Sequence, residues 1–328
     1  MKLASRKAGG RDGTLVVVDK KLQHAVKVTD IAPSLVNALE NWAMAESKLR
    51  SVAASLEAGK AKDAFTLNPA DLAAALPRAP QFVDGSAYLA HVERVRKARG
   101  AEMPPSFRDD PLMYHAVSDG FLAPTEPIRM ASEDYGIDFE SEVGVVVDDV
   151  PMGISPVDAA KHIKLILLIN DVSLRNLIPD ELAKGFGFLQ SKPRSALSPV
   201  ALTPDELGPA WIGNKVHLPL LTHLNGRKFG EPEAGVDMQF DFGRLVSHAA
   251  KTRPLAAGSI VGSGTIANQD ESKGASCHAE KRVLEVIKTG KAVTPFMKFG
   301  DTVRIEMLDK SGASLFGAIE QTIEKYAG

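Results

Sequence analysis

The sequence predicts an α+β fold in which a smaller N-terminal α+β domain, residues 1–77, precedes a β-rich domain, residues 78–328. The length of 328 residues suits two domains of unequal size. Two prolines within residues 77–80 favour an extended connection and mark the boundary. Beyond it, short apolar runs alternate with Gly, Pro and Asp, a pattern typical of strands and turns.

The N-terminal domain is predicted to begin with a hairpin and to continue into a helix. A glycine-rich turn at residues 9–13 precedes the β-branched run at residues 15–18. The spacing of Leu35, Leu39 and Trp42 then places three apolar side chains on one helical face. This segment carries no obvious chemistry, so we interpret it as a packing or oligomerisation module.

The β-rich domain is predicted to contain strands interrupted by a few helices. The expected strands cover residues 139–147, 165–169, 216–224, 259–266 and 302–307. The expected helices cover residues 87–98, 156–163 and 240–250. No fixed-period repeat is visible, which disfavours a solenoid.

Composition excludes several classes of function. The 39 basic residues nearly balance the 41 acidic ones, so the chain lacks the basic surface that a nucleic-acid or anionic-membrane binder needs. A single cysteine, Cys277, excludes a disulfide scaffold and a cysteine zinc site. No secretory signal is visible, and the longest apolar runs are far shorter than the roughly 20 residues of a membrane span. We therefore expect a soluble, cytoplasmic protein.

Acidic residues beside apolar strands are the strongest chemical signal. Glu140 and Glu142 are two residues apart, so on a strand their side chains point to the same face. Asp171 ends the apolar run 165–169, where burying a lone carboxylate would be costly. If the three meet, their oxygens suit a hard cation such as Mg²⁺, Mn²⁺ or Ca²⁺. The alternative is a pair of acids at a solvated strand end.

Two further segments contain candidate functional residues. Asp84 is expected at or near the start of the helix 87–98, which would place His91 about two turns further on. The Gly262–Ser263–Gly264 run begins like a dinucleotide-binding fingerprint, but no βαβ pattern surrounds it. A tight turn beside a strand explains those glycines better.

These motifs, in this order, resemble the fumarylacetoacetate hydrolase family. They are Asp84 with His91, the D-F-E-S-E run from Asp138, the N-D-V-S-L-R run that ends at Arg175, a loop containing Lys192, and an S-G-T-I turn from Ser263. The resemblance covers roughly residues 80–310 and implies a β-roll catalytic domain. It also implies a homodimer.

The resemblance assigns roles to individual residues. It implies four ligands for one divalent cation, Mg²⁺ or Ca²⁺ with Mn²⁺ as a further option: Asp84, Glu140, Glu142 and Asp171. His91 matches the general base, and Lys192 and Arg175 match the groups that offset negative charge during the reaction. The positions that hold substrate oxygens are Arg99, Tyr114, Arg175 and Thr265.

Two features depart from the family pattern, and two further points stay open. The acid that orients His91 is Glu280 or Glu285, and we favour Glu280. Ile178 and Leu182 stand where the family's hydrolases have Gln and Tyr, and Ser86 replaces a substrate-binding tyrosine of the animal enzymes. Residues 104–111 form either a mobile lid or a fixed loop.

The implied activity is hydrolysis of a carbon–carbon bond in a 1,3-diketo acid. The leading substrate is fumarylacetoacetate, cleaved to fumarate and acetoacetate in tyrosine and phenylalanine catabolism. The same cage serves acylpyruvate hydrolases and the decarboxylases, isomerases and hydratases of 2-oxo acids. From a different class, the acids could hold a structural ion in a non-catalytic binding protein, but this leaves His91 and Lys192 without a purpose.

Overall fold

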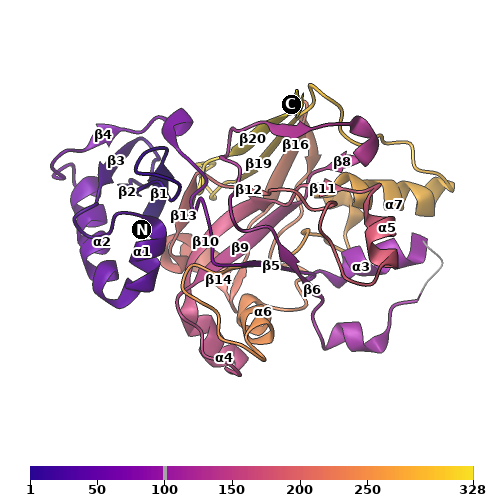
Figure 1. The fold of residues 1–328 in the computed structure, drawn as a ribbon, viewed down its shortest axis with the longest axis horizontal. Coiled ribbons are helices and arrows are strands. Elements are labelled where there is room, and N and C mark those ends of the chain that lie inside the picture. The colour runs from indigo at the N-terminus through magenta and orange to yellow at the C-terminus, as the bar shows by residue number, and fades with distance from the viewer. Residues whose placement is uncertain (99–101, 328) are drawn as a thin grey trace.

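A mixed arrangement of helices and sheets confirms the α+β prediction (Figure 1). The computed structural model describes residues 1–98 and 102–327. Its largest unit is an 11-stranded sheet, ordered β4-β3-β2-β1-β13-β10-β9-β18-β5-β6, with β12 paired to β10 off this path. In that order the main strands are Phe65–Thr66, His24–Lys27, Thr14–Val18, Lys2–Arg6, Val200–Leu202, Ile163–Asn170, Ser141–Val147, Ile260–Gly262, Phe82–Gly85 and Met113–Ala116, and β12 is Ala196–Leu197.

The N-terminal hairpin forms as predicted, since β1 and β2 pair antiparallel along their whole length. The helix expected next is two helices, α1 (Leu35–Glu40) and α2 (Trp42–Glu57), because Asn41 leaves the helical region with φ −124° and ψ 33°. Strand β1 also pairs with β13, so the N-terminal strands extend the sheet of the larger domain. The strands on either side of the predicted boundary at residue 77 thus belong to one continuous sheet.

The centre of the sheet is the antiparallel pair β9 and β10 (Figure 1). Every residue of β9 is buried, and so is every residue of β10 except Lys164. Such two-sided burial explains their continuous apolar sequence. Each strand expected in the β-rich domain overlaps an observed one.

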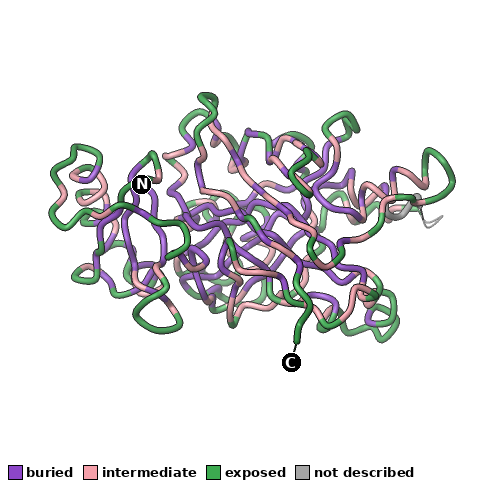
Figure 2. The backbone as a smooth tube through the Cα atoms, turned by 90° about the horizontal axis from the view of Figure 1, so that it is seen from above, coloured by how far each residue is buried: buried purple, intermediate pink, exposed green. Residues whose placement is uncertain are grey.

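A second sheet has five strands in the order β17-β16-β19-β20-β7. Their bounds are Arg227–Gly230, Leu220–Leu224, Thr302–Met307, Ile319–Lys325 and Ile128–Met130. A buried hydrogen bond of 2.7 Å between Ser141 and Thr222 joins β9 to this sheet. Viewed from above, buried backbone runs through the middle and exposed backbone lies at the loops (Figure 2).

Short helices and small strand pairs complete the fold. The helices are α3 (Leu89–Ala98), α4 (Pro156–Ala159), α5 (Ile178–Ala183), α6 (Phe242–Ala249) and α7 (His278–Thr289). The small pairs are β8 (Ile137–Asp138) with β11 (Ser173–Leu174), and β14 (Trp211–Ile212) with β15 (Lys215–Val216). Short 3₁₀ turns are Pro69–Asp71, Pro105–Arg108, Glu133–Tyr135, Ala160–His162, Pro204–Ala210 and Glu271–Lys273. Within the described residues, no helix is both long and apolar enough to cross a membrane.

Helix α7, which the sequence pattern did not predict, packs against α3. Cys277 caps its N-terminus, where the Glu280 backbone N–H donates to the sulfur at 3.3 Å. Gly290, with a left-handed φ of 79°, ends the helix. The apolar face of the helix is narrow, with Leu284 as its only buried aliphatic residue.

Candidate active site

A cavity of about 190 Å³ opens at the ends of β5 and β9, beside the loop that follows α5. It brings together side chains from five distant parts of the chain. Its lining residues are Asp84, Gly85, Ser86, Tyr88, His91, Tyr114, Glu140, Arg175, Ile178, Phe188, Lys192, Gly264 and Thr265.

Asp84 lies on strand β5 and not at a helix start, which corrects the expectation from the sequence. Helix α3 begins five residues later, at Leu89. Asp84 and His91 still line the same cavity, because the strand leads directly into the helix. The parallel pairing of β5 with β18 sets Asp84 opposite Gly262.

Asp84 and Glu142 face each other, and no basic side chain of the described residues hydrogen-bonds to either carboxylate. Neither carboxylate oxygen of Glu142 accepts a hydrogen bond from a donor group of the described chain. Burial, reinforced by the charge of Asp84, raises the pKa of Glu142 well above its usual range. Burial, followed by the charge of Asp171, raises the pKa of Asp84 to about 8. The two groups can hydrogen-bond to each other only by sharing a proton, and a cation can take the place of that proton.

Glu140, in contrast to Glu142, is surrounded by hydrogen-bond donors, two of which are cationic. Its Oε1 accepts hydrogen bonds from Arg175 at 2.7 Å and from Thr265 at 2.8 Å. Its Oε2 accepts from Lys192 at 2.6 Å and from Ser173 at 3.1 Å. Burial alone would raise the pKa of Glu140, but the charges of Arg175 and Lys192 outweigh it and hold the pKa well below its usual range.

Lys192 bridges Glu140 and Asp171, with its Nζ 2.6 Å from an oxygen of each. Burial would lower the pKa of Lys192, but these two carboxylates raise it above the usual value, so the amine stays charged. Asp171 also accepts hydrogen bonds from the Tyr114 hydroxyl at 2.5 Å and from the Ser195 hydroxyl at 2.7 Å.

Arg175 ties the cavity to the start of helix α7. Its Nε donates to Asp138 at 2.8 Å, and its Nη2 donates to Glu140 at 2.7 Å. Asp138 in turn accepts the backbone N–H groups of His278 and Ala279, at 2.8 and 2.9 Å. A carboxylate at a helix N-terminus is stabilised by those N–H groups and by the helix dipole.

His91 stands beside a buried acid. Its Nδ1 lies 3.7 Å from Oε2 of Glu280, and neither atom has another hydrogen-bond partner in the described chain. The other oxygen of Glu280 accepts from Arg94 at 2.5 Å. Arg94 also donates to the carbonyl oxygens of Asn268 and Gln269, which fixes its position. Glu285 is not part of this arrangement, since it accepts from the backbone of Val293 and Thr294.

Two glycines allow β5 and the turn after β18 to approach closely. A Cβ on Gly262 would lie 2.1 Å from Oδ1 of Asp84, and one on Gly264 would lie 2.2 Å from the Gly85 carbonyl oxygen. Gly264 also has a left-handed φ of 76°. Its N–H donates to Asp84 at 3.0 Å. This is the tight turn that the sequence predicted.

The remaining predicted positions are placed as follows. Arg99 lies outside the described residues. Ile178 and Ser86 line the cavity, and Leu182 is exposed. None of residues 104–111 lines the cavity. The backbone of this segment accepts hydrogen bonds from Gln239 and Arg244, which anchor it to the rest of the fold.

Sequence reasoning had not assigned roles to Asp138, Ser173, Ser195 and Arg94. Asp138 stood in the quoted acidic motif, and Ser195 lies three residues after Lys192. Arg94 is three residues after His91 on α3, a spacing that places two side chains on one helix face. This helical spacing could have predicted from the sequence that Arg94 acts together with His91.

The arrangement fits a divalent cation. Asp84, Glu142 and Asp171 each offer an oxygen, and these oxygens lie within 4.8 Å of one another. All three residues are buried. Both carboxylate oxygens of Glu142 lack a hydrogen-bond partner in the described chain, so they are available as metal ligands. An all-oxygen set suits a hard cation. A second group, His91, Glu140 and Cys277, fits less well, because burial raises the pKa of the Cys277 thiol and keeps it neutral.

The fold and the site therefore define a class of enzyme centre, in which buried carboxylates and a histidine–acid pair share one cavity. The family comparison agrees with that class. The description "Fumarylacetoacetate (FAA) hydrolase C-terminal" matches residues 81–324, and "Fumarylacetoacetase N-terminal domain 2" matches residues 1–78. The chain belongs to the fumarylacetoacetate hydrolase family, whose members include hydrolases and isomerases.

Solved structures share this fold at low sequence identity. A fumarylacetoacetate hydrolase from Exiguobacterium antarcticum is 17% identical with a TM-score of 0.70, and the alignment covers 99% of this chain and 100% of that chain. A maleylpyruvate hydrolase from a Sphingobium species, in complex with manganese(II) and pyruvate, is 14% identical with a TM-score of 0.64 and 99% coverage of both chains. A 2-hydroxyhepta-2,4-diene-1,7-dioate isomerase from Mycobacterium marinum is 17% identical with a TM-score of 0.61, and both chains are fully covered. The comparison with curated proteins finds no match.

Proposed function

We propose that the protein is a divalent-metal-dependent hydrolase that cleaves a carbon–carbon bond of a 1,3-diketo acid. The first substrate to consider is fumarylacetoacetate, which would give fumarate and acetoacetate in aromatic amino-acid breakdown. The observation that carries the proposal is the pair of His91 and Glu280 beside a carboxylate cluster in one cavity. Hydrolysis needs a base for water, and this pair provides one.

His91 takes the proton from the attacking water. Its Nδ1 faces the unpaired Oε2 of Glu280, so Nδ1 carries the hydrogen and Nε2 is left to accept the proton. The Glu280 carboxylate then stabilises the imidazolium that forms. Arg94 holds the other oxygen of Glu280 and so fixes the orientation of the pair.

The reaction balances with water as the only co-reactant. The water oxygen bonds to one carbonyl carbon, and the bond from that carbon to the methylene carbon breaks. The electron pair leaves with the methylene carbon as an enolate, which takes back the proton held by His91. A divalent cation held by Asp84, Glu142 and Asp171 would supply Lewis-acid polarisation of the diketone.

Lys192 and Arg175 offset negative charge in this cavity. Both are buried or nearly so, and acidic neighbours keep both charged. Positive charges fixed in a site shielded from water stabilise a developing oxyanion more strongly than they would in water. Tyr114 and Thr265 line the same cavity with hydroxyl groups that can contact substrate oxygens.

The name of the matched N-terminal domain is the consideration that supports fumarylacetoacetate over other diketo acids. The N-terminal match carries the name of a fumarylacetoacetase domain, and the two-part chain aligns along nearly its whole length with a fumarylacetoacetate hydrolase. Maleylpyruvate hydrolases share the same coverage, so acylpyruvates are the nearest competing substrates. Ile178 and Phe188 give the cavity an apolar part of its lining, which can contact a hydrocarbon chain.

The test is spectroscopic. Purified protein with Mn²⁺ or Mg²⁺ should consume the near-ultraviolet absorbance of fumarylacetoacetate faster than that of acylpyruvates. His91→Ala and Glu142→Ala should each lose about a hundredfold or more in turnover. His217→Ala, at a half-exposed histidine outside the cavity, is the matched control. Unchanged turnover in both site variants would refute the proposal, and an isomerised, uncleaved product would reassign the reaction.

A further inference from the structure

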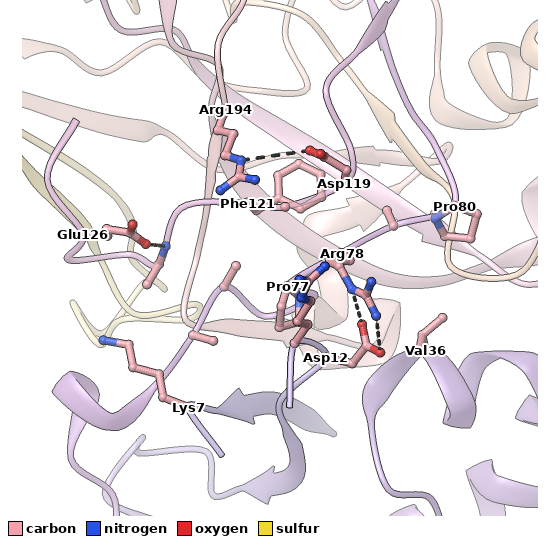
Figure 3. A pocket seen from close by; sticks show the side chains of 16 residues that line it. Lys7, Asp12, Val36, Pro77, Arg78, Pro80, Asp119, Phe121, Glu126 and Arg194 are labelled. Atoms are coloured by element: carbon pink, nitrogen blue, oxygen red, sulfur yellow. Dashed lines mark hydrogen bonds and ion pairs between the residues drawn. The ribbon is translucent and has the colours of Figure 1, made fainter. Parts of the chain in front are cut away.

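A second, larger cavity of about 860 Å³ lies between the N-terminal segment and the catalytic domain (Figure 3). Its walls come from both parts of the chain. Lys7, Arg11 and Asp12 belong to the turn between β1 and β2, and Val36 comes from α1. The opposite wall contains Pro77, Arg78, Ala79, Pro80, Asp119, Gly120, Phe121, Ala123, Glu126 and Arg194.

The charged groups of this cavity divide into paired and unpaired ones. Arg78 is fully engaged by Asp12, through two hydrogen bonds of 2.8 Å (Figure 3). Glu126 accepts the backbone N–H of Ala123 at 3.1 Å, which closes a local turn. The contact of Arg78 with Asp12 joins the two walls, and the other basic side chains of the cavity have no acidic hydrogen-bond partner among the described residues.

The groups of this cavity without a close ion-pair partner among the described residues are three basic side chains and two acidic ones: Lys7, Arg11 and Arg194, and Asp119 and Glu126. Arg194 approaches Asp119 only at 4.0 Å, and both side chains are more than half exposed, so the pair contributes little. Arg11 makes no hydrogen bond or ion pair with another residue in the part of the chain that the structure describes. Lys7 donates to the Ala70 carbonyl oxygen and has no acidic partner among the same residues.

The Arg194 guanidinium is accessible for recognition, since its side chain is 58% exposed. It lies against Gly120, where an added Cβ would stand 3.2 Å from the guanidinium carbon. The buried ring of Phe121 follows Gly120 along the same wall. A planar guanidinium whose donors are uncommitted suits the oxygens of a carboxylate or a phosphate.

This cavity is connected to the candidate active site through the chain itself. Arg194 lies between Lys192, which bridges two site carboxylates, and Ser195, which donates to Asp171. The Ser195 carbonyl oxygen accepts the N–H of Leu122 at 2.9 Å, and Phe121 N–H donates to Pro77 at 2.9 Å. A ligand that moves Arg194 therefore acts on the segment that holds the catalytic carboxylates.

We propose that this cavity is an anion-binding site for a small molecule bearing a carboxylate or phosphate dianion. Arg194 and Arg11 bind the anionic oxygens from opposite walls, with Lys7 contributing charge. Binding draws the N-terminal turn toward the loop of residues 192–196 and so orders the segment that carries Lys192 and Ser195. The site is separate from the reaction cavity and shares none of its lining residues.

The binding test uses inorganic phosphate and succinate as probes for the two sources of the anion. Each is titrated calorimetrically into the full-length protein, with chloride adjusted to keep the ionic strength constant. We expect saturable binding of at least one probe, weakened about tenfold in Arg11→Gln and in Arg194→Gln. Arg227→Gln, at an exposed arginine of β17 outside the cavity, should bind as the unmodified protein does.

Hydrogen exchange provides the second measurement, and it does not depend on the catalytic proposal. The bound probe should slow amide exchange of the peptide covering residues 192–197 in the unmodified protein and in Arg227→Gln, but not in Arg11→Gln. Binding of phosphate alone or succinate alone would assign the source of the anion. Absence of saturable binding for both, equal affinity in all variants, or binding without slowed exchange would overturn the proposal.

Discussion

Glu140 and Glu142 are two residues apart, both buried, and in opposite electrostatic surroundings. Glu140 accepts four hydrogen bonds, two of them from cations, and its pKa is held low. No donor among the described residues hydrogen-bonds to Glu142, and burial raises its pKa. We call the first set of residues, Glu140, Asp171, Lys192 and Arg175, the compensated half of the site. The second set, Asp84 and Glu142, is the uncompensated half.

The difference shows what the chain provides for itself and what it leaves to a ligand. Both basic residues of the cavity are used on the compensated half, where burial without partners would be costly. The uncompensated half retains two facing carboxyl groups that need a proton or a cation. The compensated half therefore fixes the geometry of the site, while the uncompensated half, together with Asp171, offers the carboxylate oxygens that can bind a cation.

The largest effect should come from breaking the compensated half. Glu140→Gln removes the carboxylate shared by Arg175 and Lys192, leaving two buried cations with fewer acidic partners. We expect the free energy of unfolding to fall by about 3 kcal/mol in urea denaturation. Glu324→Gln, in an exposed pair with Arg129, should change it by less than about 1 kcal/mol. Equal effects of the two variants would contradict the distinction.

A change of opposite sign is expected in the uncompensated half. In the presence of chelator, Glu142→Gln should raise the free energy of unfolding by about 2 kcal/mol, because it replaces an unsatisfied buried carboxyl group with a neutral amide. The same variant should lose the rise in melting temperature that Mn²⁺ gives the unmodified protein. A destabilised variant that still responds to Mn²⁺ would show that Glu142 has a structural partner instead.

The pH dependence of the chelated protein sharpens the comparison. Burial raises the pKa of Asp84 from about 4 in the unfolded chain to about 8 in the folded one. Between these values the folded protein binds more protons, so its free energy of unfolding should fall as the pH rises, with Asp84 contributing about 1.4 kcal/mol per pH unit at most. Denaturation midpoints from pH 5 to 8 measure this slope. Mn²⁺ should flatten the slope, as should Asp84→Asn; a slope unchanged by both would remove Asp84 as its source.

The smallest effect tests a single hydrogen bond of the compensated half. Thr265→Val keeps the shape of the side chain but removes one of the four donors to Glu140. We expect a loss of about 1 kcal/mol in the free energy of unfolding, because three donors remain. Thr265→Ser, which retains the hydroxyl group, is the control and should lose less. A loss as large as that of Glu140→Gln would mean that the threonine holds the turn rather than the carboxylate.

Much of the fold was predictable because its strongest elements carry local signals. The apolar runs of β9 and β10 and the glycine-rich turn before β2 each follow from a few neighbouring residues. Helix α7 was missed because its apolar face is narrow and its cap is a cysteine, an uncommon residue at that position. Asp84 was misplaced because only residues 86–88 separate strand β5 from helix α3, so the end of the strand could be taken for the start of the helix.

The candidate site was predictable as a set of residues and not as an arrangement. The acids, Lys192 and His91 could be named from the sequence, and the cavity brings them together. The division into two halves could not be named, because it depends on whether Lys192 reaches Glu140 or Glu142. That choice is made by the loop geometry of residues 191–195, which no local pattern encodes.

The sequence by itself determined the α+β class, the family and the kinds of group available for chemistry, since these follow from composition, periodicity and motif order. The tertiary structure alone decided which acid stands beside His91, where the cations are used and where a second, cationic cavity lies. The physical reason is that electrostatic interactions depend on distance and burial. Both are set by contacts between segments distant in the sequence, such as Arg94 with Glu280, which are 186 residues apart.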